Sequence, residues 1–151
     1  MTLHVFMSQH ELELIYLFVR CYAMTNEMIA VIDDDADQRE LIQEILDDYV
    51  VRCFPTTEAF FSEHSQLGRP SLLLCDIQME GIDGYETCRR VRQDASLSQL
   101  PIILISGLPE KANFTEAVEA GANEYMSKPF HVSELKELVE KQLTLSKAAT
   151  S

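Results

Sequence analysis

The sequence contains short runs of consecutive apolar residues, each about as long as one strand. The clearest runs are 28–32, 71–75 and 101–105, and the segments 50–54 and 123–126 are also expected to be strands. Runs that are apolar at every position, rather than at every second position, are typical of strands buried on both faces. Such strands form parallel sheets that helices cover on each side. The sequence therefore predicts a sheet of five parallel strands.

The segments between these runs have apolar residues at helical spacing. In the first of them, Leu41, Ile42 and Ile45 fall on one side of a helix. Helices are expected at 36–49, at 85–92, at 112–120 and at 132–143. A further helix, which Thr56 or Thr57 can cap, is expected to run through 59–61. Because strands and helices alternate, we predict an α/β fold with a doubly wound five-stranded parallel sheet flanked by helices.

The length and charge of the chain exclude several classes of protein. A chain of 151 residues can bury one core without disulfides or a structural metal. Its formal charge of −13 argues against nucleic-acid binding through the overall field, because phosphate contacts need a basic face. The four cysteines form no C-x-x-C pair. We interpret them as small core side chains in a reducing compartment.

Residues 1–27 precede the first expected strand and form an extension of unknown role. Their apolar stretch at 12–19 is far shorter than the roughly 20 residues that a membrane-spanning helix needs. The start of the chain also lacks the basic segment of a secretory signal, so we expect neither export nor membrane insertion but a cytoplasmic protein. The extension could be a short helix docked on the domain, a partner-binding segment, or sequence that is not normally translated. We hypothesise that Met24 is the physiological start.

Polar side chains follow four of the five expected strands at the point where each strand ends. Asp33 and Asp34 follow the first strand, Asp76 the third, Ser106 the fourth and Lys128 the fifth. Ligands of doubly wound folds bind in the crevice at the carboxyl ends of the strands. We therefore expect these side chains to converge at one edge of the sheet.

A site with three converging carboxylates has a definite chemistry. The carboxylates repel one another, so at least one should have a raised pKa unless a cation neutralises them. A cluster of oxygen ligands without thiolate or imidazole suits a hard divalent ion, above all Mg²⁺. Lys128 adds a positive charge that can pair with a phosphate oxygen. An aspartate can act as a nucleophile towards phosphorus. A calcium loop starting at Asp33 is disfavoured because Gln38 stands where the sharp turn needs glycine.

Five motifs in this order resemble the receiver domain of two-component response regulators, a CheY-like domain, over residues 28–146. Ser106 and Lys128 follow Asp76 by 30 and 52 residues, as the resemblance leads one to expect. The resemblance implies a flavodoxin-like sheet with strand order 2-1-3-4-5. The motifs are IDDD at 32–35, LCDIQMEGIDG at 74–84, PIILISG at 101–107, GA at 121–122 and KPF at 128–130.

The resemblance also implies roles for individual residues. Asp76 matches the phosphoacceptor, and Ser106 and Lys128 match the residues that contact the phosphoryl group. Tyr125 matches an aromatic residue whose rotamer is coupled to phosphorylation, and the bond between Lys128 and Pro129 matches a cis peptide. The implied Mg²⁺ ligands are Asp33, Asp34, Asp76 and the backbone carbonyl of Gln78.

These observations predict a single-domain response regulator without enzymatic output, in which residues 147–151 form a short tail. A sensor histidine kinase or a histidine phosphotransfer protein would phosphorylate Asp76, and contacts with an unknown downstream protein would then change. We expect slow autodephosphorylation, because the apolar Leu108 cannot position an attacking water. The face formed by 112–121, 123–126 and 132–143 is expected to carry the output.

Several points stay open at the level of the sequence. A receiver-like binding module that works without phosphorylation is the alternative, and a homodimer is left open. A haloacid-dehalogenase-like phosphatase is disfavoured, because Gln78 stands where such an enzyme needs a second aspartate. The pathway, the cognate kinase and the downstream partner cannot be deduced from the chain.

Overall fold

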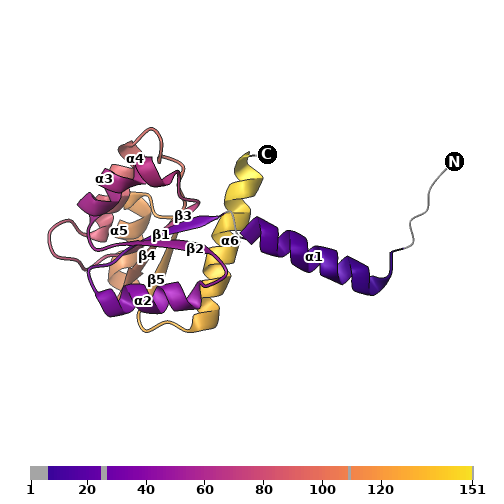
Figure 1. The fold of residues 1–151 in the computed structure, drawn as a ribbon. Helices are drawn as coiled ribbons and strands as arrows, with labels where there is room; N and C mark the ends of the chain where they lie inside the picture. Colours follow the sequence, from indigo (N-terminus) through magenta and orange to yellow (C-terminus); the bar gives the residue numbers. More distant parts are fainter. Residues whose placement is uncertain (1–6, 25–26, 109, 151) are drawn as a thin grey trace.

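The computed structural model describes residues 7–24, 27–108 and 110–150, and it confirms the predicted parallel sheet (Figure 1). The five strands lie in the order β2-β1-β3-β4-β5, and every neighbouring pair is parallel. This order reverses the direction of winding at β1, as the flavodoxin-like fold requires. The strands are β1 Met28–Ile32, β2 Val50–Phe54, β3 Leu72–Asp76, β4 Ile102–Ser106 and β5 Glu124–Ser127.

Six helices accompany the strands in the described residues, one more than the sequence predicted. The additional helix is α1, which precedes the first strand. Their bounds are α1 Gln9–Met24, α2 Ala36–Ile45, α3 Thr57–Leu67, α4 Gly84–Gln93, α5 Glu110–Ala120 and α6 Val132–Thr150.

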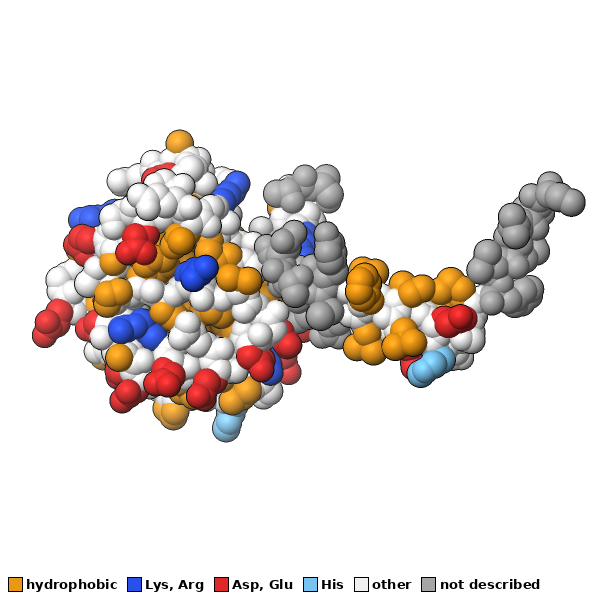
Figure 2. Space-filling view, viewed as in Figure 1, with side chains coloured by type: hydrophobic (Ala, Val, Ile, Leu, Met, Phe, Trp, Pro, Cys, Tyr) orange, Lys and Arg blue, Asp and Glu red, His pale blue; other side chains and the backbone are white. Residues whose placement is uncertain are grey.

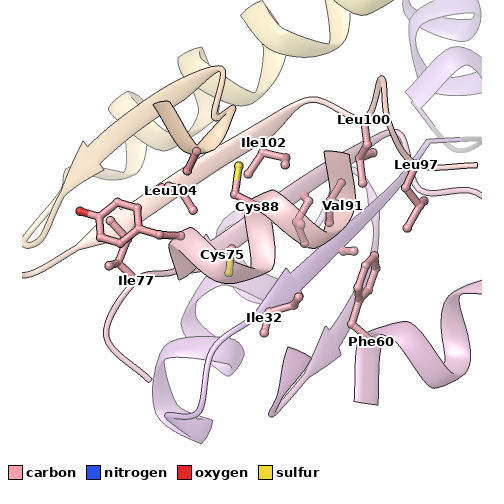
Figure 3. Close-up of a cluster of buried hydrophobic side chains, with 14 of the residues drawn as sticks. Ile32, Phe60, Cys75, Ile77, Cys88, Val91, Leu97, Leu100, Ile102 and Leu104 are labelled. Carbon is pink, nitrogen blue, oxygen red and sulfur yellow. The ribbon is translucent and has the colours of Figure 1, made fainter. Parts of the chain in front are cut away.

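The helices cover the two faces of the sheet and bury two apolar clusters. Alternate residues of the three central strands point to opposite faces, so each continuous apolar run contributes to both clusters. The cluster under α3, α4 and α5 includes Phe60 and Val91 (Figure 3). The cluster under α2 and α6 includes Ile42 and Leu135. Burying one such side chain stabilises the fold by about 1.5–3 kcal/mol, so this double burial holds the strands in register.

Side-chain caps fix the starts of three helices on these faces. The carboxylate of Asp35 accepts a hydrogen bond from the backbone N–H of Asp37, and the carboxylate of Asp83 accepts one from Glu86. Thr56, one of the two candidates, caps α3. Caps of this kind contribute about 1 kcal/mol each. Both capping aspartates, Asp35 and Asp83, are exposed.

Two predicted helix ends were wrong. The helix expected at 36–49 ends at Ile45, because Leu46 turns out of helical geometry while its N–H still donates to the carbonyl of Ile42. Two acidic residues at 47–48 follow, and negative charge at a helix C-terminus opposes its continuation. The last helix was expected at 132–143, but α6 continues through residue 150 and includes most of the segment predicted as a tail.

α1 is a regular helix that stands away from the sheet (Figure 1). It begins with a capping box: the hydroxyl of Ser8 accepts from the N–H of Glu11, whose carboxylate accepts from the N–H of Ser8. Its apolar side chains at 12–19 are exposed, so this part of the helix is not docked on the domain. No helix in the described part of the chain is long and apolar enough to cross a membrane.

The cysteines with described side chains are free thiols. Cys75 and Cys88 are buried in the core and Cys53 is partly buried, which agrees with their interpretation as core side chains. Burial raises the pKa of Cys88 to about 11, so its thiol stays protonated at neutral pH. The side chain of Cys21 lies outside the described residues.

Gly84 is the position where α4 approaches the end of β3 most closely. A Cβ atom at this residue would lie 2.7 Å from the backbone oxygen of Asp76 and 2.7 Å from the Cα of Ile77. The N–H of Gly84 also donates to the carbonyl of Ile77 at 3.0 Å. The absence of a side chain at Gly84 therefore sets how near α4 lies to Asp76.

Gly84→Ala should lower the free energy of unfolding by about 1–3 kcal/mol, because backbone atoms must move to make room. Urea unfolding of the variant and the parent protein measures this difference. Gly107→Ala is the matched control, since its Cβ would meet only the side-chain oxygen of Gln78 at an ordinary 3.5 Å. A similar loss of stability in both variants would contradict this account.

Candidate functional site

Three carboxylates meet at the carboxyl edge of the sheet, as predicted. Asp33 and Asp34 directly follow β1, and Asp76 is the last residue of β3, the strand next to β1. One carboxylate oxygen from each residue lies within 4.8 Å of the others. Asp33 and Asp76 are only 2% and 6% exposed, whereas Asp34 is exposed. The site is thus a small acidic crevice that is open on one side.

Backbone hydrogen bonds hold the strand ends and fix these carboxylates. The N–H of Asp33 donates to the carbonyl of Phe54, which extends the pairing of β1 with β2. On the other side, the N–H of Ile77 donates to the carbonyl of Ile105 on β4. Because β1 also pairs directly with β3, Asp33 and Asp76 cannot move apart without breaking sheet pairing.

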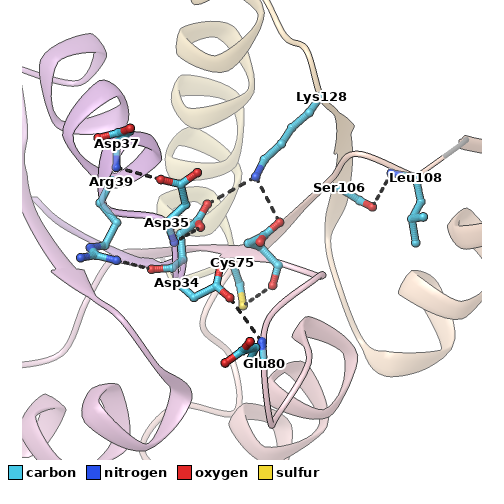
Figure 4. Close-up of polar contacts among 11 residues, drawn as sticks. Asp34, Asp35, Asp37, Arg39, Cys75, Glu80, Ser106, Leu108 and Lys128 are labelled. Carbon is cyan, nitrogen blue, oxygen red and sulfur yellow. Dashed lines mark hydrogen bonds and ion pairs between the residues drawn. The ribbon is translucent and has the colours of Figure 1, made fainter.

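Three hydrogen bonds that no sequence motif signals orient the acidic pair (Figure 4). The guanidinium of Arg39, one turn into α2, donates to the backbone carbonyl of Asp33 at 2.8 Å. The N–H of Glu80 donates to the carboxylate of Asp34 at 3.3 Å. The Asp33 carboxylate also accepts from the N–H of Asp35 at 2.9 Å. No motif signals these contacts, because they depend on how the loops fold back.

Lys128 brings a positive charge to the same crevice. Its ammonium lies 3.2 Å from the carboxylate of Asp76 and 3.4 Å from that of Asp33 (Figure 4). The backbone of Lys128 is anchored as well, since its N–H donates to the carbonyl of Ser106 at 2.7 Å. The bond between Lys128 and Pro129 is cis, as the resemblance implied. Lys128 thus offsets part of the carboxylate repulsion.

The pKa of Asp76 is raised above the usual carboxyl value. Burial is the largest cause, and the negative charge of Asp33 adds to it, whereas Lys128 lowers the pKa. Loss of hydration and the neighbouring carboxylate therefore outweigh the single lysine. A further cation at this edge would relieve the excess negative charge.

The donor set fits a hard divalent cation. Asp33, Asp34 and Asp76 offer three carboxylate oxygens close together, without sulfur or imidazole. Oxygen-only sets of this kind suit Mg²⁺, which keeps several waters and binds through a few carboxylates. Gln78 is an exposed residue two positions after Asp76. The part played by its backbone carbonyl stays a prediction.

A chain of hydrogen bonds runs from Ser106 to Tyr125 beside the acidic crevice. The buried hydroxyl of Ser106 accepts from the N–H of Leu108 at 3.0 Å and so points toward the loop after β4 (Figure 4). The hydroxyl of Tyr125 donates to the carbonyl of Leu108 at 3.2 Å. Ser106 and Tyr125 thus hold the same loop residue, one through its N–H and the other through its carbonyl.

Comparison with known proteins agrees with this geometry. Residues 29–140 match the family model of the response regulator receiver domain. The chain belongs to this family. The receiver domain of a signal transduction histidine kinase from Syntrophus aciditrophicus has the same fold, with a TM-score of 0.71 and 26% sequence identity. That match covers 78% of this chain and 90% of the other.

Curated relatives differ in how much of their length this receiver chain spans. It is 32% identical to chemotaxis protein CheY of Pseudomonas aeruginosa, over 75% of this chain and 93% of CheY. It is also 32% identical to the phosphate regulon transcriptional regulatory protein PhoB of the same organism, over 74% of this chain and 49% of PhoB. The chain spans about half the length of several curated relatives that it matches, 43–54%.

Asp76→Asn should raise the thermal unfolding midpoint of the metal-free protein by a few degrees at neutral pH. A carboxyl whose folded pKa is raised binds its proton more tightly in the folded state, so it costs stability once the pH exceeds its unfolded pKa. The difference between the variant and the parent should therefore grow as the pH rises from the usual carboxyl range through the raised pKa, and then level off. Calorimetric or fluorescence melting in EDTA across this pH range measures it.

The matched control for this experiment is Asp48→Asn. Asp48 is exposed, so its substitution removes the same charge far from the crevice. We expect a change within about 0.5 kcal/mol there, with little dependence on pH. An Asp76→Asn variant that is less stable than the parent at every pH would show that the ion pair with Lys128 outweighs the repulsion.

Proposed function

We propose that this receiver is a phosphorylation switch in which Asp76 accepts a phosphoryl group from a phosphohistidine. The observation that carries the proposal is the position of the Asp76 carboxylate, 3.2 Å from the Lys128 ammonium and close to Asp33 and Asp34. A sensor histidine kinase or a histidine phosphotransfer protein would be the donor. Asp34 is exposed, so such a donor would approach the site from this side.

The transfer consists of one displacement at phosphorus. A carboxylate oxygen of Asp76 forms a bond to phosphorus while the bond between phosphorus and the donor imidazole nitrogen breaks. The imidazole nitrogen keeps the electron pair of that bond and takes up a proton from solvent. The protein contributes mainly position and charge, because Asp76 must be ionised and held in line with the leaving nitrogen.

Lys128 and the acidic pair have complementary parts in this proposal. The ammonium of Lys128 now pairs with the Asp76 carboxylate and would pair with a phosphoryl oxygen after the transfer. The flexible lysine side chain allows this small movement. Asp33 and Asp34, together with Asp76 and the backbone carbonyl of Gln78, would hold Mg²⁺. When bound, Mg²⁺ neutralises the charge that develops on the phosphoryl oxygens. A bound cation would also reduce the repulsion among the three carboxylates at this edge of the sheet.

The contacts of Leu108 suggest how phosphorylation would reach the surface. If the Ser106 hydroxyl turned to donate to a phosphoryl oxygen, the N–H of Leu108 would lose its present partner. The loop at 107–108 would then shift, and its carbonyl would no longer hold the Tyr125 hydroxyl where it lies now. Tyr125 is on β5, between α5 and α6 in the sequence. We therefore propose that the face of α5, β5 and α6 carries the output.

Leu108 also bears on how long the phosphoryl group would last. Its side chain is apolar and exposed, so it offers no hydrogen bond to a water that attacks phosphorus. The acidic crevice then lacks a polar side chain at this position to orient such a water. We propose slow self-catalysed hydrolysis of the aspartyl phosphate, and no other enzymatic activity in this domain.

Intact-mass spectrometry after incubation with acetyl phosphate tests the proposed acceptor. With Mg²⁺ present, the parent protein should gain the mass of one phosphoryl group, and Asp76→Asn should gain none. EDTA should suppress the adduct on the parent protein, because the carboxylates then repel the anionic donor. Asp35→Asn is the matched control: it removes an exposed charge beside the site and keeps the cap of α2, since asparagine caps as well as aspartate.

Two results would overturn the proposal. A phosphoryl adduct that persists in Asp76→Asn would place the acceptor elsewhere. The absence of an adduct on the parent protein in every condition would favour the alternative, a receiver-like module that binds its partner without phosphorylation.

A further inference from the structure

α1 presents a continuous apolar surface that nothing in the described chain covers. Its side chains from 12 to 19 are 49–72% exposed, apart from the one polar residue in that stretch, Glu13. Figures 1 and 2 show the helix standing away from the sheet with apolar side chains along it. These side chains are Leu12, Leu14, Ile15, Tyr16, Leu17, Phe18 and Val19.

The exposed apolar area of α1 is larger than a soluble monomer normally tolerates. At such fractions, side chains of this size expose roughly 100 Å² each, or about 700 Å² in all. The largest apolar patch on a typical monomer is about 300–600 Å². An isolated helix of 16 residues is also marginal in water, because most helical stability in proteins comes from packing of an apolar face. α1 therefore needs a partner surface.

One stripe of the helix is arranged symmetrically about its middle. Leu12, Ile15, Tyr16 and Val19 follow the spacing i, i+3, i+4, i+7, which places them on one face. Reversing the direction of the helix exchanges position 12 with 19 and position 15 with 16. Every position of the stripe therefore meets another apolar position when two such helices lie antiparallel. An interface with a two-fold axis requires this kind of self-complementarity.

We propose that α1 is a homodimerisation element, in which two copies of this chain pair antiparallel through the stripe formed by Leu12, Ile15, Tyr16 and Val19. Glu11 and Glu13 flank this stripe near the start of the helix, and an antiparallel pair keeps the acids of the two copies at opposite ends. In the same orientation, the two receiver domains follow opposite ends of the helix pair, which is about 24 Å long. This separation matters because each chain has a formal charge of −13.

The size of this interface predicts a dimer that dissociates on dilution. At the same rough 100 Å² per side chain, the stripe offers about 400 Å² per copy, or about 800 Å² for the pair, which is the size of a weak, transient interface. The apolar side chains left outside it, Leu14, Leu17 and Phe18, then amount to roughly 300 Å². That remainder falls within the range that soluble proteins expose. Pairing with one further copy is therefore sufficient to account for the apolar surface of α1.

The charges near α1 disfavour a lipid surface as its partner. Helices that bind membranes in the interfacial plane have lysine and arginine on their polar face. Here α1 contains two glutamates, Glu11 and Glu13, against one arginine, Arg20, and the whole chain is strongly acidic. An anionic bilayer would repel the two glutamates and the acidic chain as a whole.

Sedimentation velocity of the full chain over a wide range of concentration tests the pairing. The parent protein should change from monomer to dimer as its concentration rises. Leu12→Glu should remain monomeric, because each pair would bury two carboxylates against Val19, while a glutamate this near the helix start does not disfavour the helix. Leu145→Glu is the matched control, since Leu12 and Leu145 are both 54% exposed, and it should dimerise like the parent.

Mixing two variants tests the antiparallel register. Val19→Lys should be monomeric by itself, yet an equimolar mixture with Leu12→Glu should form a dimer, because positions 12 and 19 face each other only in the antiparallel pair. A parent chain that is monomeric throughout would overturn the proposal, as would equal effects of Leu12→Glu and Leu145→Glu. A monomer that cosediments with phosphatidylcholine and phosphatidylglycerol vesicles would assign α1 to membranes instead, and a mixture that stays monomeric would rule out this register.

Discussion

Electrostatic repulsion among the carboxylates of Asp33, Asp34 and Asp76 is the constraint on which the organisation of this receiver depends. Adjacent parallel strands end at the same edge of a sheet, so acids at the ends of β1 and β3 are forced together by the same hydrogen bonds that build the fold. Lys128 at the end of β5 offsets part of the repulsion, but the pKa of Asp76 remains raised. The fold thus holds three carboxylates against one ammonium, an excess of negative charge that a further cation would balance.

The tight approach of α4 to β3 serves the same site. Gly84 lets the start of α4 lie against the backbone of Asp76 and Ile77, and Asp83 caps that helix one residue earlier. Deeper in this layer, the hydroxyls of Thr57 and Thr87 share a buried hydrogen bond of 2.6 Å between α3 and α4. These contacts hold the loop after β3. In the proposed switch, the contacts that change belong instead to the loop after β4, which is held through Leu108.

The sequence was sufficient for those parts of the structure that depend on periodicity and on strand ends. Continuous apolar runs predicted the three central strands, and shorter strand-like segments predicted the two edge strands. The polar residues after the strands predicted the meeting of Asp33, Asp34, Asp76 and Lys128. Helix ends were predicted less well, because the stop at Ile45 depends on the local turn at Leu46 and the extension of α6 has no stop signal. Contacts such as that of Arg39 with the carbonyl of Asp33 depend on loop geometry and have no sequence pattern. The exposed state of α1 also depends on tertiary placement, which apolar composition alone does not specify.

Binding of Mg²⁺ to the unphosphorylated protein, measured by isothermal titration calorimetry, tests most directly whether this acidic edge is a metal site. The account predicts one Mg²⁺ per chain, a marked loss of affinity in Asp34→Asn, and unchanged affinity in Asp35→Asn. The two variants remove the same charge from neighbouring exposed residues, but only the carboxylate of Asp34 lies within reach of Asp33 and Asp76. Equal affinity in all three proteins, or no binding by the parent, would contradict the account.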